Sequence, residues 1–203
     1  SGGSKKLKER LQNPQLRQQI KDKIIWNIVY DRGGGDPSSI VVASYPNNDK
    51  YNGLNLAQIT KLKGLSPTPD NEAEILMNLV YEGNGKGIYH CLNEEDVQRI
   101  MAHPRIMHAS DGSTIEFGEA QPHPRSYGTY PRVLGQYVRE KNVISLVESI
   151  RKMSKLPASV LGIKDRGEIK NGFWADLVIF DQHKIIDNAT WENPHQYPSG
   201  VSW

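Results

Sequence analysis

Asp111 is the side chain in this 203-residue sequence that is best placed for acid–base chemistry. It directly follows residues 106–110, a run typical of a short buried strand, and it precedes Gly112. In parallel α/β folds the carboxyl ends of the strands hold the active site, and a carboxylate there can bind a metal ion and move a proton. Because Asp-Gly pairs are also common in turns, a plain turn is the alternative interpretation.

The loop from His123 to Arg132 is a second stretch with possible chemistry. Its sequence, HPRSYGTYPR, is rich in groups that bind carboxylates. Arg125 or Arg132 could hold a substrate carboxylate through a two-point guanidinium contact, or could pair with an acidic residue of the protein itself. Tyr45, at the end of another predicted strand, could donate its hydroxyl to a substrate or simply pack its ring.

The histidines and the cysteine do not form a metal-binding motif. The six histidines show neither an HxH nor an HExxH spacing. His90 and Cys91 are neighbours on a predicted strand, where adjacent side chains face opposite ways. The single cysteine also excludes an internal disulfide. Spacing alone therefore predicts no metal site in this chain.

The composition excludes several classes of protein. A formal net charge of +2 argues against a general nucleic-acid surface. No apolar run approaches the roughly 18 residues of a membrane span, and no signal peptide opens the chain. The sequence therefore predicts a cytoplasmic protein with neither nucleic-acid nor membrane partners. Residues 1–4 are predicted to be a linker, and the basic stretch 5–23 a solvated helix interrupted near Pro14, with an anion-binding tail as the alternative.

The elements that must position these side chains alternate along the chain. Apolar patterning predicts strands at 24–30, 40–43, 88–92, 106–110 and 175–181. Capping residues and helical spacing predict helices at 54–64, 70–82, 93–103, 129–140, 145–154 and 157–161. This alternation predicts an α/β fold with parallel strand pairing, followed by a β-rich layer in about the last forty residues.

Several ordered motifs resemble the N-acyl-D-amino-acid deacylases, or D-aminoacylases, of the amidohydrolase superfamily. They are MHASDG at 107–112, HPRSYGTYPRVLG at 123–135, WADLVIFD at 174–181 and ATWENPHQ at 189–196. The resemblance covers about residues 40–200. It implies a (β/α)8 metallo-dependent hydrolase barrel with a small β-sandwich. In these terms residues 5–160 are the C-terminal part of the barrel, with its last two strands, a lid insertion at 47–92 and the final helices. Residues 161–203 are then a few strands of the sandwich.

The resemblance also implies roles for individual residues. The family hydrolyses the amide bond of N-acyl-D-amino acids with a metal-bound hydroxide, and an aspartate after the last barrel strand moves the proton. Asp111 matches that aspartate, which also binds the metal. Arg125 matches the arginine that holds the substrate carboxylate, Tyr45 a substrate-contacting tyrosine, and Leu92 a position in the substrate pocket.

The sequence departs from the family in one large respect. The family's other metal ligands all precede the matched region, so the resemblance implies a C-terminal piece of a zinc enzyme. Because a catalytic zinc needs about three protein ligands and Asp111 offers one, we expect the chain alone to bind no zinc and to be inactive.

Two classes of function stay open at this stage. The first is a metal-dependent amide hydrolase, with dihydroorotase-like or hydantoinase-like chemistry as the near alternative to D-aminoacylase chemistry. The second is a non-catalytic domain that binds a carboxylate ligand or a partner chain. Part of a barrel also exposes strand edges and apolar helix faces, which predicts self-association.

Overall fold

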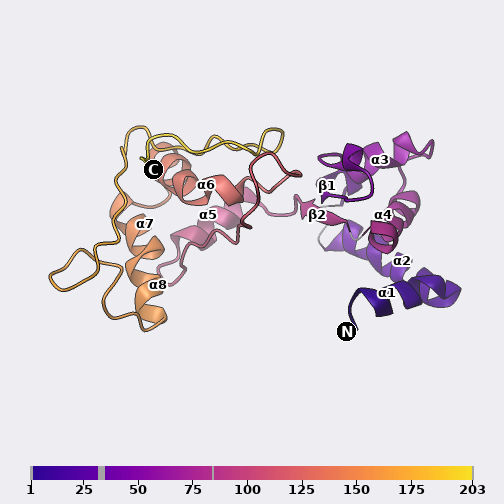
Figure 1. Ribbon diagram of the computed structural model, residues 1–203, viewed down its shortest axis with the longest axis horizontal. Coiled ribbons are helices and arrows are strands. Elements are labelled where there is room, and N and C mark those ends of the chain that lie inside the picture. Colours follow the sequence, from indigo (N-terminus) through magenta and orange to yellow (C-terminus); the bar gives the residue numbers. More distant parts are fainter. Residues whose placement is uncertain (1, 32–34, 84, 203) are drawn as a thin grey trace. The chain divides into compact units, whose positions relative to one another are not determined.

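The computed structural model describes residues 2–31, 35–83 and 85–202, and the chain divides into two compact units (Figure 1). Unit 1 holds residues 1–91 together with 119–121, and unit 2 holds residues 92–118 and 122–203. The break lies between Cys91 and Leu92, at the end of the predicted insertion 47–92. None of the helices in the described ranges is long and apolar enough to cross a membrane.

Unit 1 begins with two helices, α1 (Gly3–Gln12) and α2 (Pro14–Tyr30). Asn13 separates them, because its side chain accepts a hydrogen bond from the Leu16 amide at 3.1 Å and Pro14 favours the first helical position. The predicted interruption near Pro14 is confirmed. The predicted linker 1–4 extends too far, since α1 already begins at Gly3.

The strand predicted at residues 24–30 is wrong, because these residues form the second half of α2. Their Ile and Val side chains favour strands only weakly, and a helix already begun at Pro14 continues through them. Within that half, Ile28 is buried in the core of unit 1, whereas Trp26 and Tyr30 are exposed. Packing of one helix face therefore overrides the local strand preference.

The two strands of unit 1, β1 (Ile40–Ser44) and β2 (Lys86–Tyr89), form an antiparallel pair with Ile40 opposite Tyr89. The prediction of parallel pairing is therefore wrong for these strands. Lys86 lies opposite Ser44 at the other end of the pair. A Cβ on Gly83 would lie 2.5 Å from the Tyr45 ring, so only glycine fits beside the residue that follows β1.

Two further helices cover this pair, α3 (Leu56–Leu62) and α4 (Pro69–Gly83), as predicted from their spacing. Short 3-10 turns, η1 (Pro37–Ser39) and η2 (Asp49–Tyr51), flank β1. The helices and β1 enclose one apolar core. Its buried members are Ile28, Ile40, Val42, Tyr45, Leu56, Ile59, Ile75 and Leu79.

Unit 2 contains α5 (Glu94–Ala102), α6 (Arg125–Arg132), the π-helix η3 (Val133–Glu140), α7 (Leu146–Met153) and α8 (Lys155–Val160). The predicted helices at 93–103, 129–140, 145–154 and 157–161 are confirmed, although 129–140 is part α-helix and part π-helix. Tyr137 donates a hydrogen bond to Glu94 at 3.1 Å, and Lys141 pairs with the same carboxylate. These contacts tie η3 to α5.

Lys152 of α7 is fully buried in unit 2. Its ammonium group donates hydrogen bonds to the carbonyl oxygens of Met101 and His103, the latter at 2.7 Å. A positive charge at the C-terminal end of α5 also interacts favourably with the helix dipole. Burial lowers the pKa of Lys152 from its ordinary value.

The strands predicted at 106–110 and 175–181 are absent from the described part of unit 2. Ile106 and Met107 are partly exposed, and the His108 amide bonds to the carbonyl of Lys152 rather than to a strand. Val178 and Ile179 are largely exposed, and residues 175–181 pair only at an isolated bridge from Phe180 to Val201. A strand requires a continuous ladder to a partner, and among the described residues these segments have no more than that single bridge.

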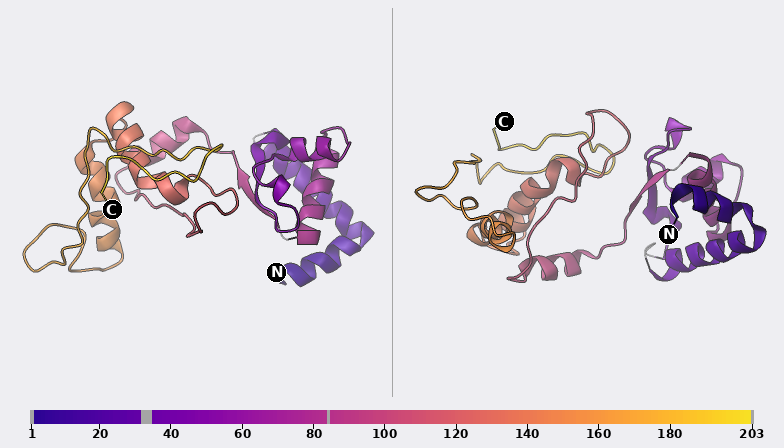
Figure 2. Two further views of the ribbon diagram at one scale, coloured as in Figure 1. Left: turned by 45° about the horizontal axis from the view of Figure 1, so that its top comes forward. Right: turned by 60° about the horizontal axis from the view of Figure 1, so that its bottom comes forward.

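The C-terminal segment, residues 181–200, runs beside α6 and η3 (Figures 1 and 2). It approaches these helices closely at two glycines. A Cβ on Gly128 would lie 2.6 Å from the Asp187 side chain, and one on Gly135 would lie 2.6 Å from the Ile185 carbonyl oxygen. Arg132 adds an ion pair with Asp187 at 3.0 Å, which fixes the segment in place.

Candidate active site

Asp111 lies on the loop that leads into α6, in a backbone conformation that few residues adopt. Its φ is +46°, in the left-handed region where Asp and Asn are better tolerated than most side chains. Gly112 follows at a close approach, since a Cβ there would lie 3.1 Å from the Cα of Ser126. The sequence prediction of a buried strand before Asp111 is wrong, since residues 106–110 form no strand.

Arg125 is the first residue of α6, and its backbone is fixed by a histidine. The Nδ1 atom of His123 accepts a hydrogen bond from the Arg125 amide at 3.0 Å, which satisfies one of the free amides at the start of the helix. The guanidinium Nη2 of Arg125 lies 2.9 Å from Oδ2 of Asp111. The structure thus brings together the two residues that the sequence assigned to proton transfer and carboxylate binding.

The pair is open to solvent, with side-chain exposures of 42% for Arg125 and 86% for Asp111. An exposed ion pair of this kind contributes at most about 1 kcal/mol to stability. Both groups are therefore available to an incoming ligand at small cost to the fold.

A cavity of about 350 Å³ adjoins this pair. Four hydroxyl groups and two tyrosine rings account for most of its wall. The lining residues are Ser110, Gly112, Ser113, Thr114, Ile115, Ser126, Tyr127 and Tyr197. The arrangement suits a small, polar group.

The other two predicted substrate contacts lie in different surroundings. Tyr45 belongs to unit 1, where its ring is buried and stacks on Tyr51 with centroids 5.7 Å apart. Its hydroxyl donates to Glu82 at 3.2 Å, and burial raises the pKa of Tyr45. Leu92 belongs to unit 2 and is 85% exposed.

Sequence reasoning missed three residues near this site, namely Phe117, Tyr127 and His195. His195 accepts a hydrogen bond from the Gly118 amide at 3.1 Å, and Tyr127 and Phe117 pack their rings against it. The available signal was compositional: aromatic and histidine side chains recur both in the loop before α6 and at residues 191–197.

The described residues do not assemble a metal centre. Among them, no group of three or more His, Cys, Asp and Glu side chains is placed to hold a metal ion. Asp111 already pairs with Arg125, so a cation at its carboxylate would compete with the guanidinium. The described residues therefore do not fit a zinc ion on their own.

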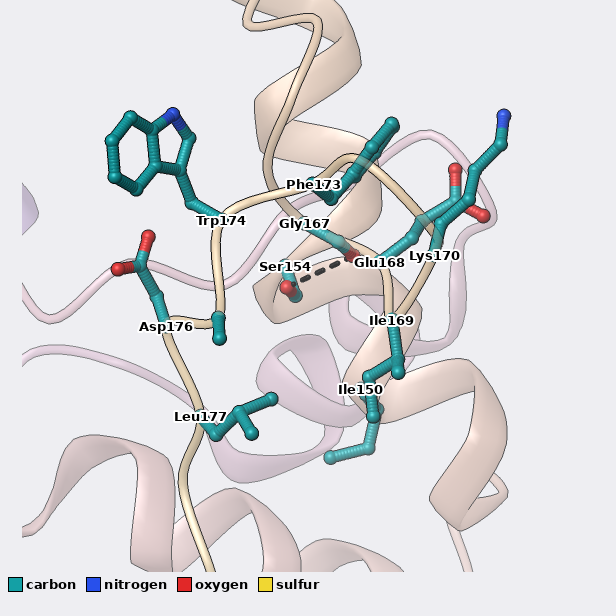
Figure 3. Close-up of a pocket in the computed structure, with 11 residues that line it drawn as sticks. Ile150, Ser154, Gly167, Glu168, Ile169, Lys170, Phe173, Trp174, Asp176 and Leu177 are labelled. Atoms are coloured by element: carbon teal, nitrogen blue, oxygen red, sulfur yellow. Dashed lines mark hydrogen bonds between the residues drawn. The ribbon is translucent and has the colours of Figure 1, made fainter.

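A second cavity, of about 270 Å³, lies between the end of α7, Ser154 and residues 167–177 (Figure 3). Ser154 donates a hydrogen bond to the carbonyl of Gly167 at 3.1 Å across its floor. Its two carboxylates are engaged, because Glu168 pairs with Lys155 and Asp176 pairs with Arg166, and the Lys170 ammonium lies over the Phe173 ring at 5.3 Å. The remaining wall is mostly apolar, so this cavity offers no acid–base chemistry.

Comparison with known proteins decides the family. A model of the amidohydrolase family matches residues 54–201, most of the chain. The chain belongs to the amidohydrolase family. This confirms the superfamily that the motifs predicted.

The relatives of this amidohydrolase are deacylases. An N-acyl-D-glutamate deacylase and a D-aminoacylase, both from Alcaligenes xylosoxydans xylosoxydans, are 43% and 41% identical to it over 114 residues. Those residues make up 56% of this chain and 23% of each relative. The predicted resemblance to D-aminoacylases is confirmed.

Solved structures agree with this assignment. An N-acyl-D-glutamate deacylase from Bordetella bronchiseptica, complexed with zinc and a phosphonate inhibitor, superposes with a TM-score of 0.71 at 32% identity, covering 83% of this chain and 33% of that one. A D-aminoacylase described as defining a novel subset of amidohydrolases gives a TM-score of 0.69 at 33% identity, with coverage of 80% and 32%. This amidohydrolase chain thus spans about a quarter of the curated relatives and a third of the solved ones.

Proposed function

We propose that this chain supplies part of the substrate site of a metal-dependent hydrolase that cleaves the amide bond of N-acyl-D-amino acids. The observation that carries the proposal is the ion pair between Asp111 and Arg125 at the start of α6. The D-aminoacylase and N-acyl-D-glutamate deacylase relatives support the choice of substrate class. In this proposal residues 5–160 correspond to the end of a (β/α)8 barrel and residues 161–203 to part of a β-sandwich.

In the proposed reaction Arg125 binds the carboxylate of the N-acyl-D-amino acid, because the guanidinium fork matches that group. Asp111 takes up at Oδ2 the proton of the water whose oxygen bonds to the amide carbonyl carbon, and it delivers that proton to the amide nitrogen as the C–N bond breaks. Since Asp111 Oδ2 already accepts from Arg125, the substrate carboxylate competes with Asp111 for the guanidinium. Substrate arrival would then free the aspartate for proton transfer.

Tyr45 and Leu92 are the two remaining proposed substrate contacts. A substrate oxygen would take the place of Glu82 at the Tyr45 hydroxyl. Leu92, with its side chain largely exposed, is free to contact an apolar part of the substrate.

We also propose that the 203-residue chain alone does not hydrolyse these substrates. A catalytic zinc needs about three protein ligands, and the described residues bring no such group together. The test is zinc content and N-acetyl-D-methionine hydrolysis by the purified chain with added zinc. Turnover that EDTA abolishes would contradict this part of the proposal.

Replacement of Asp111 by Asn tests the catalytic role in an active context. The context is a chimera in which residues 54–201 replace the matching segment of the Bordetella bronchiseptica deacylase. Asn tolerates the left-handed conformation of Asp111, so the fold should survive, whereas its amide cannot accept the proton. We expect turnover to fall by about 10²–10⁴-fold.

The matched control is Glu116→Gln, which removes an exposed carboxylate from the same loop and should leave turnover unchanged. Near-normal turnover of the Asp111→Asn chimera would remove Asp111 from the mechanism. A folded, zinc-loaded parent chimera without deacylase activity would instead favour a non-catalytic carboxylate-binding domain.

A further inference from the structure

His195 lies where the loop after Asp111 meets the first turn of α6. The Gly118 amide donates a hydrogen bond to its Nδ1 atom at 3.1 Å. The Tyr127 hydroxyl lies 3.1 Å from the same nitrogen. Gly118 ends the loop that begins at Asp111, and Tyr127 follows Arg125 by two residues. One atom of the C-terminal segment therefore joins the two stretches that carry the candidate active site.

The protonation state of His195 follows from these partners. A backbone N–H can only donate, so Nδ1 must accept and cannot carry a proton. With Nδ1 accepting, the ring proton is on Nε2. Toward this nitrogen the Tyr127 hydroxyl can only donate, and it shares the single Nδ1 lone pair with the Gly118 amide. Burial, with a contribution from Tyr197, raises the pKa of Tyr127, which keeps that hydroxyl protonated.

Aromatic rings hold His195 in this orientation. The Phe117 ring lies 5.4 Å from the imidazole, and the Tyr127 ring meets it edge-on at 5.8 Å. Tyr197, two residues along the same segment, stacks on Phe117 at 5.4 Å and meets Tyr127 edge-on at 5.5 Å. The histidine can therefore act as a fixed acceptor rather than as a mobile surface side chain.

Three contacts join the loop to the first turn of α6. Asp111 pairs with Arg125 at one end, and the Ser113 amide donates to the Ser126 hydroxyl at 3.3 Å. The His195 bridge closes the other end. The cavity of about 350 Å³ has walls from the loop, from α6 and from Tyr197. Its shape therefore depends on all three contacts.

We propose that His195 is a positioning residue, whose unprotonated Nδ1 fixes Gly118 and Tyr127 and so sets the wall of the cavity beside Asp111 and Arg125. It acts through Tyr127 on the first turn of α6, and it does not touch the reacting atoms. The fixation of the loop is a property of this chain alone. Only its effect on ligand affinity rests on the proposed function.

Two variants of the 203-residue chain separate the acceptor from the ring. His195→Phe keeps an aromatic ring against Phe117 and Tyr127 but removes the acceptor. His195→Asn removes the ring but can place a carbonyl oxygen where Nδ1 lies. If the acceptor matters, we expect exchange of the Gly118 amide with solvent to accelerate about five- to tenfold in His195→Phe and to stay within about twofold in His195→Asn.

The tautomer is read independently from the imidazole nitrogen shifts of the parent chain by NMR. We expect an unprotonated Nδ1 and a protonated Nε2. A proton on Nδ1, or equal Gly118 exchange in the parent and His195→Phe chains, would overturn the proposal. Faster Gly118 exchange in His195→Asn than in His195→Phe would overturn it too, because ring packing alone would then explain the contact.

Ligand affinity is a second measurement. If His195 served only to pack its ring, affinity would not fall in His195→Phe and stay unchanged in His195→Asn. Titration with N-acetyl-D-glutamate, followed on the Arg125 and Ser126 amides, should show about fivefold weaker binding for His195→Phe and near-parent binding for His195→Asn. Equal affinity of the parent and His195→Phe chains would contradict an effect on the cavity. If the parent chain itself does not bind, the proposed function fails at Arg125, whereas the Gly118 exchange still decides the role of His195.

Discussion

The interiors of the two units contain different kinds of buried side chain. In unit 1 the most buried side chains include Leu56 and Ile59, both 0% exposed, in a continuous apolar core. In unit 2 the side chains with no exposure are Ser149 and Lys152. Each bonds to a backbone carbonyl, Ser149 to that of Leu146 and Lys152 to those of Met101 and His103. Thr60 of unit 1 is equally unexposed and bonds to the carbonyl of Leu56, and unit 2 has an apolar core of its own around Met101, Val133, Tyr137 and Ile144. The difference is that the fully buried side chains of unit 1 include large apolar ones, whereas those of unit 2 among the described residues are polar.

This difference explains why the candidate active site lies on the less regular unit. Loops can present functional groups when a scaffold holds them. In unit 2 the scaffold is a set of specific bonds, in which Lys152 holds the segment before Asp111, and His123 and His195 hold the segment around Arg125. Polar contacts to the main chain thus position the site.

The largest stability effect should come from the apolar core of unit 1. Leu56→Ala removes a fully buried side chain and leaves a cavity, so we expect a loss of about 2–5 kcal/mol in the free energy of unfolding. The measurement is urea unfolding followed by amide signals from unit 1. Leu62→Ala, on the same helix but 67% exposed, is the control and should change stability by less than about 0.5 kcal/mol. Equal losses at Leu56 and Leu62 would contradict the view that the buried apolar core stabilises unit 1.

A smaller effect is expected at Lys152. Lys152→Met leaves the carbonyls of Met101 and His103 without their buried donor, which should cost about 1–3 kcal/mol. Urea unfolding followed by amide signals from α5 and α7 measures it, with the half-exposed Lys155→Met as the control. An unchanged or increased stability would mean that burying the ammonium costs as much as its hydrogen bonds return.

The smallest effect, and the sharpest in sign, concerns pH. Burial lowers the pKa of Lys152 below 10.5, so the folded state binds fewer protons than the unfolded state just below that pH. The contribution of Lys152 to stability therefore rises with pH up to about 10.5. Hydrogen bonding to Asp70 raises the pKa of Lys21 in unit 1, so its contribution is full below 10.5 and falls as pH rises through the raised value.

The check is the difference in unfolding free energy between the parent and each of the variants Lys152→Met and Lys21→Met, measured across this pH range. If the contributions of Lys152 and Lys21 to the unfolding free energy changed with pH in the same direction, the prediction that burial and ion pairing shift their pKa values in opposite directions would be wrong. Opposite slopes would extend the comparison of the units from packing to charge.

Helices were predictable from the sequence because their signals are local. Asn55, Asn93 and Ser145 each cap a helix where the sequence placed one. Two strands were also predictable, since those expected at 40–43 and 88–92 correspond to β1 and β2. The strands expected at 106–110 and 175–181 do not form, because a strand needs a partner from elsewhere in the chain and local patterning does not reveal one. Local patterning also could not tell that residues 24–30 would continue a helix already begun.

The candidate site divides in the same way. Asp111 and Arg125 were recognisable from their types and motifs, but their mutual pairing was not predicted. His195 lies 77 residues from Gly118 in the sequence, so no local pattern could link it to the loop. Contacts between residues so far apart in the sequence depend on how the chain packs, and the spacing of residue types does not reveal them.

The π-helix η3 has a consequence for insertions and deletions. A π-helical turn holds one residue more than an α-helical turn, so Val133–Glu140 carries an extra residue in its register. Deleting one residue at its start while the winding is kept would rotate every later side chain by roughly the 100° of one helical residue. Gly135 would then no longer face Ile185 and Ile186, and Tyr137 would turn away from Glu94. In an evolutionary series, this helix is therefore a place where chain length should stay constant while side chains vary.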